Sequence, residues 1–288
     1  MKWTPGNREN VEDARGQSGG GGLRLGGLGL GGLIVVLLLS WATGIDFLSL
    51  LSGGGGDVAT TPSANVRGGE LRTTPDEERL VDFVDAVMKD AQAMWQQKLS
   101  GKYQPTRAVI FRDAIESKCG FAQSATGPFY CPADQLVYLD LGFFNELRQR
   151  FRAPGDFAQA YVLAHELGHH VQRLLGIEMQ VRQLQQARPD QQNALSVRLE
   201  LQADCFAGVW GHEAAQPGRA AQGKVELESG DIEEGLNAAA SIGDDRIQRM
   251  AGARVAPDRF THGSSEQRVS WLRRGFSSGD PRACETFQ

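Results

Sequence analysis

The sequence predicts an α+β fold, in which a mostly helical domain with a small sheet follows a single N-terminal transmembrane helix. Three observations predict it: an uncharged stretch of 21 residues near the N-terminus, two runs typical of β-strands before the middle of the chain, and apolar residues at helical spacing through much of the rest. The length of 288 residues suffices for one sizeable domain with an appendage. The net charge of -5 and the lack of any Lys/Arg-rich run argue against a nucleic-acid-binding protein.

The uncharged stretch, LGGLGLGGLIVVLLLSWATGI, covers residues 25–45. About 20 helical residues cross the hydrocarbon core of a bilayer, and no polar face repeats as it would on a soluble helix, so we expect a membrane span. A cleaved signal peptide is the alternative, but the polar leader of 24 residues is long for one. Basic residues precede the span at Lys2, Arg8, Arg15 and Arg24, and the next follows only at Arg67. The positive-inside rule therefore predicts a cytoplasmic N-terminus and an exported remainder.

Composition divides the chain into four segments: a disordered polar leader at 1–24, the span at 25–45, a flexible Gly/Ser/Thr-rich tether at 46–73, and a folded domain at 74–288. The domain starts with a strong helix signal, a threonine cap followed by proline and then glutamate at the third helical position. We expect Asp156 to cap the central helix. Periodicity and Gly/Pro breaks predict strands at 108–113 and 135–141, and helices at 75–99, 143–152, 156–176 and 188–211, with more helices through Arg274.

The four cysteines form an even set without the C-x-x-C spacing of a zinc knuckle. In an exported domain we expect them to pair. Three connectivities are possible. We favour Cys119–Cys131, which closes a short loop, with Cys205–Cys284, which would tie the C-terminal tail to the core. Each bridge would stabilise the domain by about 2–4 kcal/mol.

Residues 165–169 read HELGH and match the zinc-binding pattern H-E-x-x-H. Residues four apart share one helix face, so His165 and His169 can point their imidazoles at one ion, with Glu166 close to a water on that ion. Zinc lowers the pKa of such a water to about 7, and a nearby carboxylate can accept its proton. A chance pair of exposed histidines is the alternative. The motif lies in a helix with a broad apolar face, where unpaired polar side chains are costly, and this favours a ligand role.

Catalytic zinc usually takes three protein ligands, and residues 200–204 (ELQAD) offer the third. Glu200 and Asp204 lie four apart, so Glu200 can bind the ion while Asp204 accepts the second N–H of a ligand histidine. A solvated acidic face is the alternative interpretation of this spacing alone. A buried site is favoured by the apolar neighbours Leu199, Leu201, Ala203, Phe206 and Ala207.

HELGHH (165–170) followed by ELQADCFAG (200–208) resembles the neutral zinc metallopeptidases of bacteria, which are gluzincin-type zincins. The resemblance covers essentially the whole chain, including the apolar span, FYCPADQLVYLD (129–140) and the final C-x-T-F. It implies a zincin-like domain, one Zn²⁺ per chain and a peptide or protein substrate. Together with the predicted span, it implies a single-pass protein of the bacterial inner membrane with its catalytic domain outside the cytoplasm.

A second resemblance links the chain to the HtpX-type membrane proteases, whose Glu-x-x-x-Asp helix is similar to ELQADCFA. Residues 261–268, THGSSEQR, are similar to their His-Pro-x-x-x-x-Arg segment. This implies that His262 stabilises the tetrahedral intermediate and that Arg268 organises the site. Two features depart from that pattern: Gly263 stands where those proteases carry proline, and they are multipass, whereas one span is predicted here.

Two further residues near the motif have less specific interpretations. His170 points about 100° away from His169 on a helix, so it cannot share the ion, and we interpret it as structural or as a support for the ligands. Tyr138 could line a groove in which an extended substrate pairs with a strand, and a core tyrosine is the equally supported alternative.

The predicted function is a membrane-anchored zinc metallopeptidase, with Glu166 as the general base toward water and then as the acid toward the leaving amine. A catalytically silent, metal-stabilised scaffold tethered to the membrane is the competing hypothesis. A structural zinc site is closed by four protein ligands and has no use for a carboxylate beside them, so Glu166 favours the enzyme. A third possibility keeps the chemistry but makes binding of misfolded chains the main role, with slow and unselective cleavage.

Overall fold

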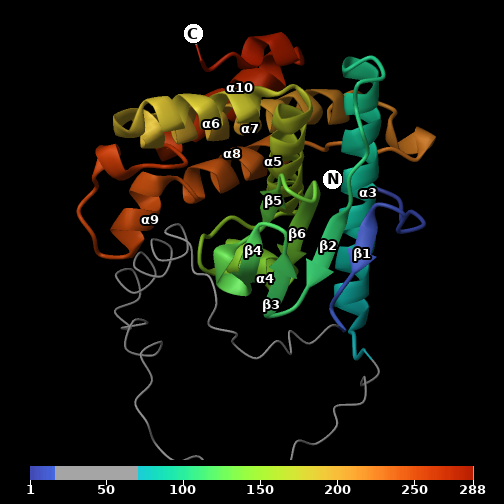
Figure 1. Ribbon diagram of the computed structural model, residues 1–288. Coiled ribbons are helices and arrows are strands. Elements are labelled where there is room, and N and C mark those ends of the chain that lie inside the picture. The colour runs from blue at the N-terminus through green and yellow to red at the C-terminus, as the bar shows by residue number, and fades with distance from the viewer. Residues whose placement is uncertain (17–70, 288) are drawn as a thin grey trace, which may run out of the picture.

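The computed structural model describes residues 1–16 and 71–287 of the protein, and the predicted span lies outside these residues. A four-stranded sheet has the order β1 (Val11–Asp13), β2 (Ala108–Phe111), β6 (Leu136–Asp140) and β5 (Phe129–Cys131). The first three strands are parallel, and β5 runs antiparallel to β6 at the edge of the sheet. A separate hairpin is formed by β3 (Ala114–Ser117) and β4 (Gly120–Gln123) (Figure 1).

Helices make up most of the described structure. They are α3 (Pro75–Lys98), α4 (Gly142–Gln149), α5 (Asp156–Leu174), α6 (Ile177–Ala187), α7 (Gln192–Ala214), α8 (Asp231–Ser241), α9 (Asp244–Met250) and α10 (Ser265–Ser278). The central helix α5 contacts β5 on one side and packs against α3, α7 and α8. The fold is therefore mixed α and β, mostly helical with small sheets, as the sequence predicts. The side chains of α3, α5 and α7 form the core with β2 and β6.

The predicted helices and strands are present, with ends that shift by a few residues. The helix expected at 188–211 starts as a short 3₁₀ turn at Pro189–Gln191 and continues as α7. The expectation that Asp156 caps α5 is wrong: Asp156 is the first helical residue and Gly155 is the cap. The carboxylate of Glu234 on α8 accepts the Phe157 N–H at 3.1 Å, which supplies from another helix the acceptor that a local cap would provide.

The N-terminal residues belong to the folded domain. Strand β1 pairs in parallel with β2, so that Val11 lies opposite Ala108, and the Ala14 N–H donates to the Ile110 carbonyl at 2.8 Å. Arg8 and Arg15 both form ion pairs with Glu78 on α3, at 2.6 and 2.8 Å. The expectation of a disordered leader is therefore wrong for residues 1–16. A three-residue strand among polar residues is too short to show an apolar period, and it is held in place by contacts distant in the sequence.

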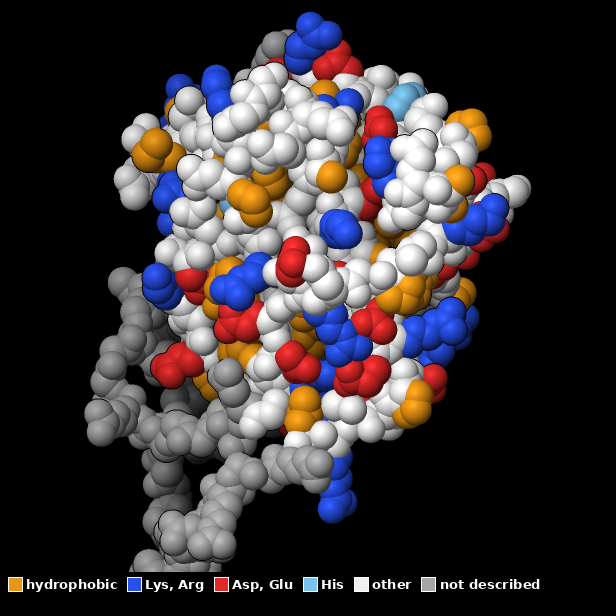
Figure 2. All heavy atoms as spheres, turned by 90° about the vertical axis from the view of Figure 1, so that its right-hand side faces the viewer, with side chains coloured by type: hydrophobic (Ala, Val, Ile, Leu, Met, Phe, Trp, Pro, Cys, Tyr) orange, Lys and Arg blue, Asp and Glu red, His pale blue; other side chains and the backbone are white. Residues whose placement is uncertain are grey.

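This pairing conflicts with the predicted membrane arrangement. A single crossing by residues 25–45 would put residues 1–16 and the domain on opposite sides of the bilayer, whereas β1 and β2 can pair only on one side. Strands β1 and β2 lie beside α3 at the right of Figure 1, on the face where Figure 2 shows acidic and basic side chains interspersed. A cytoplasmic N-terminus with an exported domain therefore cannot coexist with this sheet. Within residues 1–16 and 71–287, no helix is long and apolar enough to cross a membrane.

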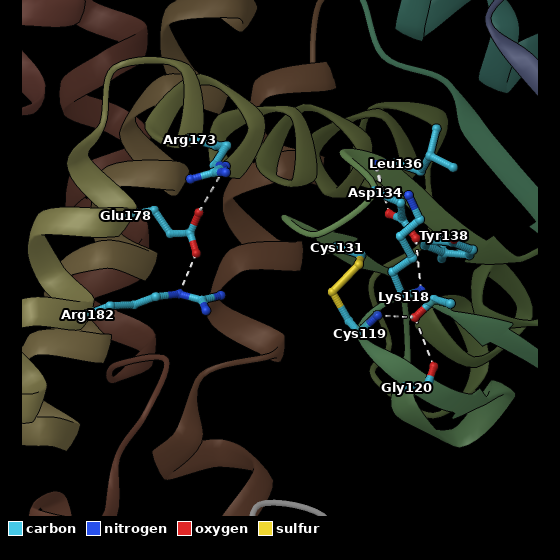
Figure 3. The surroundings of a disulfide bond; sticks show 11 residues. Lys118, Cys119, Gly120, Cys131, Asp134, Leu136, Tyr138, Arg173, Glu178 and Arg182 are labelled. Atoms are coloured by element: carbon cyan, nitrogen blue, oxygen red, sulfur yellow. Dashed lines mark hydrogen bonds and ion pairs between the residues drawn. A yellow bond between two sulfur atoms is a disulfide. The ribbon is translucent and has the colours of Figure 1, made fainter.

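Both expected disulfides are present. Cys119–Cys131 connects the β3–β4 hairpin to edge strand β5, as Figure 3 shows, and Cys205–Cys284 connects α7 to the C-terminal segment. All four cysteines are thus paired as predicted.

Candidate metal centre

Helices α5 and α7 bring His165, His169 and Glu200 together, with one ligand atom of each within 4.8 Å of the others. The Glu200 carboxylate lies 3.1 Å from His165 Nε2 and 3.5 Å from His169 Nε2. This approach depends on Gly168, the fourth residue of HELGH: a Cβ there would lie 3.0 Å from the backbone of Ala203 on α7. Any larger residue would push the two helices, and hence the ligand atoms, apart.

A buried ion pair fixes the orientation of His165. Asp204 is fully buried and accepts hydrogen bonds from His165 Nδ1 at 2.8 Å, from the Tyr161 hydroxyl at 2.5 Å and from Arg268 at 2.9 Å. Burial raises the pKa of Asp204, but the charges of Arg268 and His165 and the hydrogen bonds from both together outweigh it and lower this pKa to about 2. The carboxylate therefore stays ionised, holds the Nδ1–H tautomer of His165 and leaves Nε2 facing Glu200.

Gln172 accepts a hydrogen bond from Nδ1 of His169, as Asp204 does from Nδ1 of His165. This role of Gln172 was not predicted from the sequence. Its side-chain oxygen lies 2.9 Å from His169 Nδ1, while its amide nitrogen donates to the Leu199 carbonyl at 2.7 Å. Gln172 therefore ties the second histidine to the backbone of α7, next to Glu200. Its position one helical turn after His169 was the available signal, but a glutamine at that spacing is common on any helix.

The donor set fits a zinc ion. Two imidazole Nε2 atoms and one carboxylate converge, and each Nδ1 is already occupied by an acceptor. Without a cation, burial lowers the pKa of His169, but the charges of Glu200 and Glu166 and the hydrogen bonds to Glu200 and Gln172 together outweigh it and raise this pKa to about 9. For Glu200, burial raises the pKa, but the charges of His169 and His262 and the hydrogen bonds from His165 and His169 together hold it well below the usual range. A divalent cation would compete with protons for these ligand atoms.

The triad lies in a cavity of about 840 Å³ together with Glu166 and His262. Glu166 follows His165 directly, is largely buried, and accepts no hydrogen bond from the residues that the structure describes. A carboxylate without a partner at the edge of a metal triad is suited to accept a proton. Apolar residues of α4, α9 and their flanks also line the cavity, namely Phe143, Phe151, Ile242, Ile247 and Met250, together with the charged Glu146 and Arg150.

Asp244 holds the loop that carries His262 through hydrogen bonds to its backbone. This role of Asp244 was not predicted from the sequence. One oxygen of Asp244 accepts the backbone N–H groups of Thr261, His262 and Gly263 at 2.7, 2.7 and 3.0 Å, and the other lies 3.3 Å from His262 Nδ1. Loss of solvent lowers the pKa of His262, but the charges of Glu200 and Asp244 outweigh it, so the net pKa is raised. His262 is therefore held at the cavity with an N–H available for donation.

Gly263, the departure from the His-Pro pattern, has a conformational reason. Its φ of +96° lies in the left-handed region, which proline cannot adopt, and its N–H is one of those that Asp244 accepts. Arg268 lies one turn further on, buried beside Asp204. The structure thus brings the three candidate ligands, Glu166 and His262 to one cavity, and Asp204 and Arg268 to the network beneath it.

Tyr138 and His170, for which the sequence left two interpretations open, are both buried in the structure. Tyr138 is a core residue: it is buried, stacks on Phe129 and donates to Asp134 at 2.8 Å (Figure 3). The residues of the sheet that line the cavity are Phe129 and Tyr130 on β5, which is the edge strand. His170 is fully buried, and burial lowers the pKa of its imidazole.

Comparison with known proteins agrees with this site. The chain is 47% identical to the uncharacterized protein YpfJ of Escherichia coli (strain K12) over 300 aligned positions, which cover 100% of the chain and 99% of the relative. It is 42% identical to the uncharacterized protein Rv2575 of Mycobacterium tuberculosis over 225 positions, covering 76% and 74%. No solved structure matches it. The family model described as "Putative neutral zinc metallopeptidase" matches residues 1–287, and the chain belongs to this family of neutral zinc metallopeptidases.

Proposed function

We propose that the protein is a zinc-dependent peptidase whose metal is held by His165, His169 and Glu200. The observation that carries the proposal is the Glu166 carboxylate beside this triad, which accepts no hydrogen bond from the described residues and lines a cavity large enough for a peptide segment. A purely structural metal site would need a fourth protein ligand and no open space. The catalytically silent scaffold is therefore the less supported alternative.

The residues of the chain divide the proposed reaction between them. When bound, zinc supplies a Lewis acid that acidifies water and polarises the scissile carbonyl. Glu166 removes a proton from the attacking water and then delivers it to the leaving amine. His262 donates a hydrogen bond to the carbonyl oxygen as its negative charge develops, an interaction worth about 3–4 kcal/mol in comparable sites. Asp204 and Arg268 keep His165 in the tautomer and orientation that a ligand requires.

Edge strand β5 is the proposed docking site for the substrate backbone. It lies at the edge of the sheet, and Phe129 and Tyr130 line the same cavity as the triad. An extended peptide can add to such an edge through main-chain hydrogen bonds. The apolar cavity residues of α4, α9 and their flanks, of which Ile247 and Met250 are 40% and 46% exposed, would then receive apolar side chains of the substrate.

The proposed place of action is an oxidising compartment outside the cytoplasm, because both cysteine pairs are bridged. Attachment to the membrane through residues 25–45 stays a prediction. If it holds, the β1–β2 pairing requires residues 1–16 to lie on the same side as the domain.

The test compares the full-length protein with Glu166→Gln, measuring metal content by mass spectrometry and casein hydrolysis. The control is Glu146→Gln, a second glutamate that lines the same cavity but lies on α4, away from the triad. We expect one zinc per chain in all three proteins and a loss of at least about 10²-fold in hydrolysis only for Glu166→Gln. Zinc with no hydrolysis by any of them would favour the scaffold. Turnover by Glu166→Gln would contradict the mechanism, and a protein without metal would contradict the site.

A further inference from the structure

His170, the last histidine of HELGHH, is fixed at both ring nitrogens. Nε2 lies 2.6 Å from the carbonyl oxygen of Gln104, and Nδ1 lies 3.0 Å from the hydroxyl of Tyr130. A carbonyl only accepts, so Nε2 carries the proton, and Nδ1 of the neutral ring accepts the Tyr130 O–H. The ring is fully buried, with Tyr103 edge-on against it at 5.5 Å between centroids. His170 therefore links two neighbours: its Nε2–H donates to the Gln104 carbonyl, and its Nδ1 accepts from the Tyr130 hydroxyl.

Tyr130 is the middle residue of edge strand β5. It pairs with Val137 of β6, and its side chain lies partly exposed at the metal cavity. On one side the strand is held to the sheet by this pairing and to the hairpin by Cys119–Cys131. Among the described residues, the Tyr130–His170 hydrogen bond is the one that connects a β5 side chain to helix α5.

The connection reaches the same helical turn that provides the metal ligand. His169 and His170 are consecutive residues of α5, and their rings point about 100° apart, one toward Glu200 and the other toward β5. One hydrogen bond, from Tyr130 to His170, and one peptide unit of α5, from His170 to His169, thus connect β5 to the triad. A peptide paired with β5 would have its carbonyl placed over the triad by that connection.

We propose that His170 is a positioning residue, which through Tyr130 sets the distance between edge strand β5 and the metal triad and so aligns an extended substrate for cleavage. The inference rests on the proposed peptidase function. β5 must keep a constant distance from the triad, because a small displacement of a bound substrate strongly lowers the rate of cleavage.

The test uses Tyr130→Phe, which removes the hydroxyl and keeps the ring. The matched control is Tyr138→Phe, which also removes one hydroxyl from the same sheet, but one that donates to Asp134 in the loop between β5 and β6. Each purified full-length protein is assayed with a fluorogenic peptide of about eight residues and with a blocked dipeptide too short to pair along β5. We expect Tyr130→Phe to lose about two- to tenfold in kcat/KM for the long peptide, mostly through kcat because the bound peptide is misaligned, and to keep its activity on the short one.

Several outcomes would overturn the inference. These are an equal loss on both substrates, no loss on the long peptide, or the same long-peptide loss in Tyr138→Phe. In a double-mutant cycle, adding His170→Phe to Tyr130→Phe should leave the long-to-short ratio unchanged, since both changes break the same connection. Should His170→Phe fail to fold, the comparison of the two tyrosine variants decides alone. A wild-type protein that holds zinc but cleaves neither substrate would instead contradict the proposed function, which keeps the two failures distinct.

Discussion

Two clusters of charged side chains hold distant parts of this chain together, and they do so in different surroundings. At the metal centre, Asp204 and Arg268 are 0% and 3% exposed, and Tyr161 forms hydrogen bonds with both of them. On the outer face, Arg8 and Glu78 are 37% and 34% exposed at their side chains, while Arg15, which also pairs with Glu78, is 1% exposed. Breaking the first pair leaves a charge in a low-dielectric interior, whereas water screens the second. The buried cluster therefore keeps the catalytic geometry, and the exposed one only keeps residues 1–16 in place.

The largest effect is expected when the position of residues 1–16 relative to the domain is tested in the cell, because the outer cluster forms only if both lie on the same side of the membrane. Cysteines introduced at Thr4 and at Phe121, both exposed, can be labelled in intact spheroplasts with a membrane-impermeant maleimide. With β1 paired to β2, both positions label or neither does. Labelling of Phe121→Cys alone would support the single-pass arrangement, and it would mean that β1 is not part of the sheet in the membrane-bound protein.

The next largest effect is expected for Asp204→Asn. Arg268 would lose its counter-charge while staying buried, which costs about 3–5 kcal/mol of unfolding free energy. His165 would lose a charged acceptor at Nδ1, so zinc affinity should fall about 10- to 100-fold. Chemical denaturation and competition with a zinc chelator measure the two effects.

The control for Asp204→Asn is Asp280→Asn, which removes the acid of another Asp–Arg pair. Its partner Arg282 is 91% exposed, so neither stability nor zinc affinity should change measurably. Equal effects of the two substitutions would show that burial does not distinguish the clusters.

The metal ligands could be predicted from sequence because their geometry is local. Four-residue spacing on one helix places His165 and His169 together, and the same spacing relates Glu200 to Asp204. Helices α3 and α5 are long and periodic, and α7 is a long segment that follows Pro189, so they too were predictable.

What the sequence could not reveal depends on contacts between separate elements. Gln172 and Asp244 have ordinary residue types at ordinary spacings, and their roles appear only when α7 and the 261–263 loop pack beside them. Strands β1 and β5 span three residues each, too few for a period of two to be recognised. Tyr138 was considered for the substrate groove because β5, which forms the edge of the sheet in front of it, was not predicted as a separate strand.

The smallest predicted effect is the pH dependence of the outer cluster. Hydrogen bonds from Arg8 and Arg15 lower the pKa of Glu78 to about 2, from an ordinary value of 4.5. A group whose pKa is lower in the folded state stabilises the fold above its unfolded pKa and loses that contribution as pH falls through the folded value. Docking of residues 1–16 should therefore weaken between about pH 4.5 and pH 2, a range that overlaps the one in which Asp204 loses its own contribution to stability.

Hydrogen exchange of the peptide containing residues 1–16 measures this effect, after correction for the intrinsic rate at each pH. Glu78→Gln should raise exchange at pH 7 by a small factor and flatten the acid response, because the titrating carboxylate is gone. Glu9→Gln, in the exposed part of the same segment, should leave the response unchanged. An unchanged acid response in Glu78→Gln would mean that strand pairing with β2, rather than the ion pairs to α3, holds β1 on the domain.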